Sequence, residues 1–497
     1  MTRLFESHKL FNIFKVPVRY KNPDHHWSVL KKKKRSTQKA LEHFDDFYKT
    51  VYGEDWKNIR SALLNNKEHK YVAIVNNFSD VERISQELET IGAIDLKAIY
   101  KAFEATMKND ELKEDDEIHT KDQITVLQNI IAQKQEEVTK YKKIDPEDEY
   151  PTVEKKKLPI DQFQPTQLQS IETSASSGDN KSRVIQSSSG IASSQLFEFV
   201  PTKQLIGMDD WVLESDHYNY YKEGSDFTIK VVEETELNFP DALKIYTYEE
   251  GNHSKFPKAK TGSTGAADYF CLDGASIFPV LSLDLQPADT MLDMCAAPGG
   301  KSMMALQTLY PRIIVANDIQ TSRTNRINDF LEEFLPDMGD WREKFFLTQS
   351  DARHIDEQNI YNKILVDVPC TTDRHVLHED ENNIFKGTRT KERLRLPQLQ
   401  SEILVNALKI VVPGGTVVYS TCSLSPVQND GVVQMSLKRA YEEYNVVFVV
   451  KDQTRALLPL KYLYNFGDFG LKYGHIVVPS KSRNSGPMYF CKMVRVQ

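Results

Sequence analysis

The sequence predicts an α/β fold in the C-terminal half of the chain, built on a mostly parallel sheet of seven strands, with a helical region before it. Two observations support this fold class. Short apolar runs recur between residue 290 and the end of the chain, and amphipathic segments with helical spacing lie between most of them. Strands that alternate with helices form parallel sheets, and those helices cover the two faces of the sheet.

Each expected strand is one of these short apolar runs. The seven runs are Thr290–Met294, Arg312–Asn317, Lys344–Thr348, Asn362–Val366, Gly415–Ser420, Val446–Val450 and Met488–Val494. Apolar residues recur every three or four positions in three segments between them, which is typical of helices. These segments are Ser302–Leu309, Ser322–Phe334 and Leu396–Leu408. The carboxyl ends of the parallel strands should therefore meet at one edge, where ligands bind in open α/β sheets.

Composition divides the chain into five predicted segments. Residues 1–36 are basic, and residues 37–107 carry apolar side chains at helical spacing. Residues 108–195 are first acidic and then rich in serine, a composition typical of disordered insertions. Residues 196–261 are expected to extend the α/β domain, which occupies residues 262–497.

The basic start of the chain has two interpretations. Its first 40 residues hold 11 Lys and Arg but only two acidic residues, and basic positions alternate with bulky apolar ones. This pattern is typical of a mitochondrial presequence, which is cleaved and does not join the fold. A solvated basic tail or a nuclear signal is the alternative.

Composition also excludes several classes of protein. No run of 18 apolar residues is present, so no membrane span is expected. The five cysteines are odd in number and include no Cys-x-x-Cys pair, so neither a disulfide framework nor a metal site is expected. The net charge of −8 arises in the first half of the chain, so it neither supports nor excludes RNA binding.

The clearest motif, Asp-Met-Cys-Ala-Ala-Pro-Gly-Gly-Lys, follows the first strand at residues 293–301. Gly299 and Gly300 allow a ligand to approach the backbone, and the helix that begins near Lys301 presents free N–H groups to it. The P-loop pattern requires a glycine where Cys295 stands, and a Gly-x-Gly-x-x-Gly dinucleotide fingerprint is absent. The ligand is therefore not expected to be a nucleoside triphosphate or a dinucleotide.

Acidic residues end the next two strands. Asp318 can accept both ribose hydroxyls of a bound nucleoside, and Asp351 would lie beside its adenine. Either residue taken alone could be a helix N-cap. The glycine loop, Asp318 and Asp351 stand at three successive strand ends. This arrangement favours an adenosine ligand and is the one used for S-adenosylmethionine.

Two cysteines follow the fourth and fifth strands, on the same edge as the glycine loop. Cys370 lies in Val-Asp-Val-Pro-Cys-Thr, and Cys422 lies in Ser-Thr-Cys-Ser. A buried cysteine is usually an inert apolar residue, an interpretation that suits Cys271, Cys295 and Cys491. Loops at strand ends are where function concentrates in this architecture, so Cys370 and Cys422 are the candidate reactive thiols.

The glycine-loop motif and these two cysteine motifs, in this order, resemble those of the NOL/NOP/Sun family of RNA 5-methylcytosine methyltransferases. The resemblance covers about residues 262–497. It implies a Rossmann-like S-adenosylmethionine-dependent methyltransferase domain. It also implies a set of cofactor-binding positions, namely Gly299, Gly300, Lys301, Asp318, Arg323, Asp351, Ala352 and Asp367.

The resemblance further implies a division of labour between the two thiols. Cys422 would add to carbon 6 of cytosine, which makes carbon 5 nucleophilic enough to take the methyl group. Cys370 would assist release of the product, and Asp367 would meet the Watson–Crick edge of the flipped base. DNA cytosine methyltransferases attack with the Pro-Cys cysteine instead, so the opposite assignment remains open. The attacking thiol should have its pKa lowered by nearby positive charge or N–H groups.

Two longer stretches resemble the mitochondrial ribosomal branch of the family. They are residues 370–375 together with 381–386, and the ending Gly-Pro-Met-Tyr-Phe-Cys-Lys-Met at 486–493. This resemblance implies the mitochondrial matrix as location and mitochondrial small-subunit rRNA as substrate. It also implies a mitochondrial transcription termination factor-type partner and a role with mitochondrial ribosomal subunits in assembly.

Two further hypotheses follow from the sequence. A ribosome-assembly factor that retains the methyltransferase fold only for binding is the alternative to an enzyme. Six Lys and Arg residues between Arg374 and Arg395 could contact RNA phosphates beside the reactive edge, or form a solvated charged loop.

Overall fold

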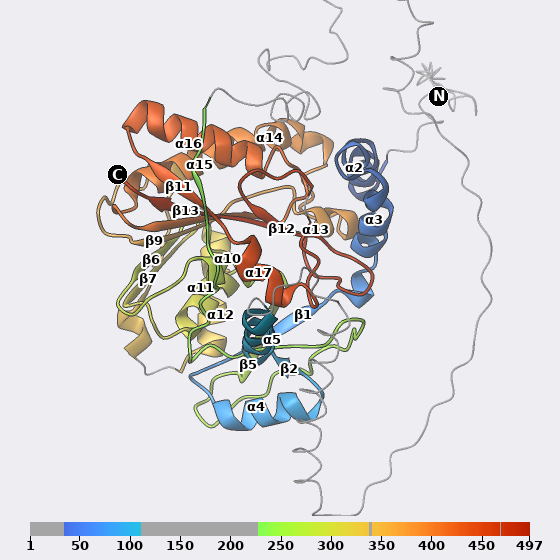
Figure 1. The fold of residues 1–497 in the computed structure, drawn as a ribbon, viewed down its shortest axis with the longest axis vertical. Coiled ribbons are helices and arrows are strands. Elements are labelled where there is room, and N and C mark those ends of the chain that lie inside the picture. Colours follow the sequence, from blue (N-terminus) through green and yellow to red (C-terminus); the bar gives the residue numbers. More distant parts are fainter. Residues whose placement is uncertain (1–33, 111–226, 337–339, 468) are drawn as a thin grey trace, which may run out of the picture.

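The computed structural model describes residues 34–110, 227–336, 340–467 and 469–497. Most of the expected presequence, all of the insertion after residue 110 and the first part of the 196–261 extension lie outside the described residues. The described chain forms a large central sheet with helices on both faces and a smaller sheet below it (Figure 1). None of the helices in the described ranges combines the length and apolar character needed to cross a bilayer.

The large sheet has nine strands, eight of them in the order β3-β11-β13-β10-β9-β6-β7-β8, with β12 paired to β13. Seven of the nine are the predicted strands: β6 (Thr290–Asp293), β7 (Ile313–Asn317), β8 (Phe345–Thr348), β9 (Lys363–Asp367), β10 (Thr416–Thr421), β11 (Phe448–Asp452) and β13 (Met488–Arg495). The pairs among β6 to β10 are parallel, whereas β13 runs antiparallel to β10 and β11. The predicted α/β fold and its mostly parallel sheet are confirmed.

Two strands extend the predicted seven. They are β3 (Val231–Glu233), which pairs with β11, and β12 (His475–Val477), which pairs with β13. Each is three residues long, too short for an alternating pattern to be recognised in the sequence.

Successive residues of the central strands contribute to two different cores. Met291 packs with α10 (Phe278–Ser282), α11 (Gly300–Gln307) and α12 (Thr321–Phe334), whereas Leu292 packs on the other face. That other face is covered by α15 (Leu396–Ile410) and α16 (Asp430–Tyr444). The alternation follows from the two-residue period of a strand, and it explains why the central strands read as continuous apolar runs.

The N-terminal region is helical as predicted, with α2 (Ser36–Tyr52), α3 (Trp56–Leu64), α4 (Val81–Thr90) and α5 (Leu96–Asp110). It also contains two strands that the helical prediction did not include, β1 (Tyr71–Val75) and β2 (Ile94–Asp95). These strands pair with β4 (Ile245–Thr247) and β5 (Tyr269–Asp273) in a four-stranded sheet of order β2-β4-β1-β5. Their partners lie far along the chain, so local periodicity could not reveal them.

The N-terminal region shares its cores with the α/β domain. Phe44 and Tyr48 of α2 belong to the same buried cluster as Leu404 of α15 and Tyr419 of β10. Helix α2 packs beside α13 (Asp373–His378), which directly follows the Cys370 loop (Figure 1). The four-stranded sheet likewise takes strands from three of the predicted segments, so these segments are not separate units in the described chain.

Candidate active site

The glycine loop turns the chain from β6 into α11 at the carboxyl edge of the sheet. Gly299 has φ 106°, a left-handed conformation in which other residues are strained. A side chain at Gly300 would collide with Leu272. The backbone conformation of Gly299 therefore requires a glycine, whereas a side chain at Gly300 would require Leu272 to move.

Asp293, the first residue of the motif, is a buried carboxyl that the sequence did not single out. Ser302 Oγ donates to its Oδ2 over 2.6 Å, while its Oδ1 is buried and accepts no hydrogen bond from the described residues. Burial raises the pKa of Asp293 to about 7. Its position as the last residue of β6, before a run of small residues, was the available signal.

Asp318 lies after β7 with a side chain that is 2% exposed. Its Oδ1 accepts from Gln320 N over 3.1 Å, and Arg323 Nη1 lies 3.4 Å from Oδ2. Oδ2 itself accepts no hydrogen bond within the described residues. A buried carboxylate oxygen without a donor is costly, so this atom is available for a hydroxyl donor from a ligand.

Asp351 has more local partners than Asp318. Its Oδ1 caps the short helix η5 (Ala352–His354) by accepting from Arg353 N over 3.0 Å, and its Oδ2 lies 2.7 Å from Arg353 Nη2. The bonds from Arg353 hold the pKa of Asp351 below its usual range. Ala352 is buried, and its carbonyl accepts from Asn406 Nδ2 over 2.8 Å. The N-cap interpretation is thus correct for Asp351.

An ion pair joins the glycine loop to the cysteine strands. Lys301 Nζ lies 2.6 Å from Asp367 Oδ2, and Ser420 Oγ donates to Asp367 Oδ1 over 2.8 Å. Burial opposes the charge of Lys301, but Asp367 and then Cys422 act the other way, and the net pKa of Lys301 is raised. Lys301 is therefore a fixed positive charge between the expected cofactor positions and the reactive thiols.

The two candidate thiols lie together, as predicted. Cys370 Sγ and Cys422 Sγ are 3.2 Å apart, and both side chains are half-buried. The hydrogen bond with Cys370, burial and the charge of Asp367 raise the pKa of Cys422 well above its ordinary value, against the opposing effect of Lys301. The expectation of a lowered pKa is therefore not met, because Cys370, burial and Asp367 together outweigh Lys301.

Comparison with known proteins identifies the family to which this site belongs. Residues 280–465 match the family described as 16S rRNA methyltransferase RsmB/F. The chain is 32% identical over 475 residues to the 5-cytosine rRNA methyltransferase NSUN4 of Xenopus laevis, and the alignment covers 95% of this chain and 93% of that protein. The chain belongs to the NOL1/NOP2/Sun family of RNA 5-methylcytosine methyltransferases. It is thus an S-adenosylmethionine-dependent enzyme of the RNA cytosine-C5 class, as its motifs predicted.

Two other alignments cover about half of this chain. The 5-cytosine rRNA methyltransferase NSUN4 of Bos taurus is 44% identical over 256 residues, which is 51% of this chain and 66% of that protein. The mitochondrial tRNA (cytosine(34)-C(5))-methyltransferase of Danio rerio is 34% identical over 260 residues, which is 52% of this chain and 66% of that protein. The alignment with the rRNA enzyme of Xenopus laevis therefore extends over more of the chain than the alignment with the tRNA enzyme.

The residues at the carboxyl edge fit the cofactor of this family. The donor-free Oδ2 of Asp318 suits a ribose hydroxyl, and Gly299 and Gly300 form the turn from β6 into α11. These features were expected from the sequence. The ion pair of Lys301 with Asp367 was not, because 66 positions separate the two residues.

The basic segment between Arg374 and Arg395 is less available for RNA than its composition indicated. Arg374 is half-buried and donates to the carbonyls of Gly486 and Ala62 and to Asn484 Oδ1, so it is bonded within the protein. Arg389 pairs with Glu392 over 2.6 Å. Lys391 remains exposed.

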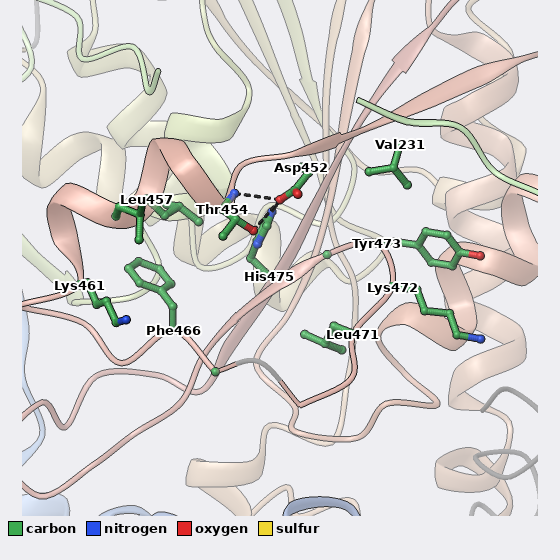
Figure 2. Close-up of a pocket in the computed structure, with 13 residues that line it drawn as sticks. Val231, Asp452, Thr454, Leu457, Lys461, Phe466, Leu471, Lys472, Tyr473 and His475 are labelled. Atoms are coloured by element: carbon green, nitrogen blue, oxygen red, sulfur yellow. Dashed lines mark hydrogen bonds and ion pairs between the residues drawn. The ribbon is translucent and has the colours of Figure 1, made fainter. Parts of the chain in front are cut away.

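A separate hollow of about 340 Å³ lies beside β11 and β12, and it contains none of the predicted site residues. Figure 2 shows Asp452, Thr454 and His475 in contact with one another at its wall. Asp452 accepts from Thr454, and His475 Nε2 accepts from Gln453 N over 2.9 Å. These polar groups are bonded to the protein itself, and neither candidate thiol lines this hollow.

Proposed function

We propose that this chain methylates carbon 5 of a cytosine in mitochondrial small-subunit rRNA, through a covalent bond between Cys422 and carbon 6. The observation that carries the proposal is the pair of sulfurs 3.2 Å apart beside the Lys301–Asp367 ion pair. One thiol alone would suffice for attack, whereas a second within contact distance suits a reaction in which the first must later leave.

In this proposal the Cys422 thiolate forms a bond with carbon 6, and the electrons of the C5–C6 double bond move to carbon 5. When bound, the cofactor would supply an electrophilic methyl group to carbon 5, and its sulfur would keep the electron pair of the broken S–CH3 bond. Loss of the carbon 5 proton returns its electrons to the ring and breaks the S–C6 bond, a step that Cys370 assists. Asp367, held by Lys301 and Ser420, meets the polar edge of the base.

The Cys422 thiolate has to form although the pKa of the thiol is raised in the free protein. The first cause of this shift is contact with Cys370. A base that enters between the two loops would remove this contact and leave Lys301 as the nearest charge in favour of the thiolate. Substrate binding would then activate the nucleophile.

The cofactor would be held by residues of three strand ends. Asp318 would accept the ribose hydroxyls, with Asp351 and Ala352 beside the adenine. The backbone of Gly299 and Gly300 would face the methionine portion. Lys301, Asp367 and Arg323 complete the proposed set, and Arg323 would balance the charge of Asp318.

The choice of RNA and compartment rests on similarity. The alignment with a named rRNA methyltransferase is nearly full-length, which favours rRNA over tRNA. The basic segment 1–36 supports a presequence and a mitochondrial matrix location. A mitochondrial transcription termination factor-type partner and mitochondrial ribosomal subunits belong to the same proposal. The presence of both thiols, Asp367 and the complete glycine loop favours an active enzyme over a pure assembly factor.

The proposal is tested by methyl transfer from labelled S-adenosylmethionine to purified small-subunit rRNA and to tRNA. We expect rRNA to be labelled and Cys422→Ala to abolish labelling while cofactor binding remains. Cys271→Ala, a cysteine on the exposed side of β5, is the matched control and should keep full activity. Labelling of tRNA alone, or full activity of Cys422→Ala, would refute the proposal. Mapping 5-methylcytosine in mitochondrial rRNA after depletion of the protein would then locate the modified nucleotide.

A further inference from the structure

A buried hydrogen-bond network connects the N-terminal helix α2 to both cysteine loops. Its centre is Asp373, the first residue of α13, whose side chain is fully buried. Among the described residues no cation is in contact with this carboxyl group; burial raises its pKa, and its hydrogen-bond donors act in the opposite direction. An uncompensated buried carboxylate is costly, and a fold that keeps one must hold the donors around it in place.

The donors to Asp373 come from both cysteine loops. Thr371 Oγ1, next to Cys370, donates to Oδ1, and Leu424 N, two residues after Cys422, donates to Oδ2 over 2.7 Å. The backbone N of Asp373 also donates to the carbonyl of Cys422 over 3.3 Å. The side chain and the backbone N–H of Asp373 therefore connect the loop that contains Cys370 to the loop that contains Cys422.

The remaining strong donor is supplied by the N-terminal region. Tyr48 OH donates to Asp373 Oδ2 over 2.7 Å and lies 3.4 Å from Ser423 Oγ, the residue after Cys422. Tyr48 is 1% exposed and packs against the rings of Phe44 and Trp56. Its hydroxyl is thus held in place by an aromatic cluster on α2 and α3, far along the chain from the loops that it contacts.

We propose that Asp373 and Tyr48 are positioning residues that set the distance between the Cys370 and Cys422 sulfurs, so that α2 forms part of the catalytic apparatus. The inference rests on the proposed function of the two thiols. It assigns the N-terminal helix a role in the chemical step itself rather than only in stability. Because neither residue reaches the sulfurs directly, each acts through the backbone of the loops.

The test variant is Tyr48→Phe in the full chain, which removes one hydroxyl and keeps the ring. We expect kcat to fall about tenfold, the loss that accompanies one hydrogen bond to a charged group. The KM for S-adenosylmethionine should stay the same, because the cofactor positions are not in contact with Tyr48. As the matched control, Tyr246→Phe removes the hydroxyl of a buried tyrosine of β4 that donates to Glu89 of α4, and it should leave kcat unchanged.

A second measurement separates positioning from simple destabilisation. The rate of Cys422 alkylation by iodoacetamide is followed against pH, and the alkylated residue is identified by mass spectrometry. Loosening of the loops in Tyr48→Phe weakens the contact with Cys370 that raises the pKa of Cys422, so the curve should move to lower pH. The Lys301 and Asp367 charges that also face Cys422 are left in place.

Two substitutions of Asp373 provide the third test. Asp373→Asn keeps an acceptor for Tyr48 and Leu424, so it should retain more turnover than Asp373→Ala. The inference is overturned if Tyr48→Phe keeps the wild-type kcat and alkylation curve, or if Asp373→Asn is no more active than Asp373→Ala while both remain folded. If Cys422→Ala is itself fully active, the proposed function fails instead, and the two failures are thereby distinguished.

Discussion

Two parts of the carboxyl edge of the large sheet are held in place in different ways. They are the cofactor end, at the ends of β6 and β7, and the cysteine end, at the ends of β9 and β10. At the ends of β6 and β7, Asp293 is bonded to Ser302 nine positions away and Asp318 to Gln320 two positions away. At the ends of β9 and β10, the network around Asp373 includes Tyr48, 325 positions away. The cofactor end is therefore built from local sequence, whereas the cysteine end depends on the N-terminal region.

One ion pair connects the two ends. Lys301 belongs to the glycine loop and Asp367 to the strand before Cys370, and their side chains are 2.6 Å apart. Substitution of Lys301 or Asp367 should affect both cofactor binding and the two thiols. Substitution of a residue outside this pair should affect only the end at which it lies. This difference can be tested in four ways, which follow in order of expected effect.

The largest effect is expected from Asp367→Ala. This change removes two hydrogen bonds, leaves Lys301 without its carboxylate and deletes the proposed contact with cytosine. We expect single-turnover methyl transfer to fall about 10³-fold, from two charged hydrogen bonds of a few kcal/mol together. A rate within about tenfold of wild type would show that the two ends are not coupled through Asp367.

Asp318→Ala tests the cofactor end alone. The variant loses the carboxylate oxygen that lacks a donor in the described structure, so the Kd for S-adenosylmethionine should rise about 100-fold. Asp351→Ala should raise it less, because both oxygens of Asp351 are already bonded to Arg353. Isothermal titration calorimetry measures both values. Equal effects of the two changes would contradict the distinction between them.

Cys370→Ala tests the cysteine end through pH. The contact with Cys370 is the first cause of the raised pKa of Cys422, so its removal should lower that pKa. A lower pKa gives more thiolate at a given pH, and alkylation of Cys422 should then begin at lower pH than in wild type. Cofactor affinity should not change. A curve that stays in place would mean that burial and Asp367, not Cys370, control the thiol.

The smallest effect is expected in the hollow of Figure 2. Lys461→Ala changes an exposed side chain on its wall without touching either end of the reactive edge. Methyl transfer and cofactor affinity should remain within about twofold of wild type, as is usual for surface substitutions. A larger loss would mean that this hollow takes part in substrate binding.

The difference between the two ends also explains what the sequence could predict. The seven strands and the glycine loop are visible because apolar runs and motif residues are contiguous, and the strand-end rule then placed Asp318 and Cys422 on one edge. Strands β1 and β2 were missed because they are stabilised by partners far along the chain. Tyr48 and Asp373 were missed for the same reason. The basic composition indicated an RNA contact for Arg374, whereas the structure bonds this residue to the protein. Composition does not show whether an arginine is bonded within the protein or exposed.

The measurement that tests the account most directly is the trapping of a covalent RNA–protein adduct. Wild type, Cys370→Ala, Cys422→Ala and the double variant are incubated with rRNA and S-adenosylmethionine, and RNA that remains bound is detected on denaturing gels. We predict that Cys370→Ala accumulates an adduct through Cys422, and that Cys422→Ala and the double variant form none. An adduct in Cys422→Ala, attached to Cys370, would contradict the assignment and exchange the roles of the two thiols.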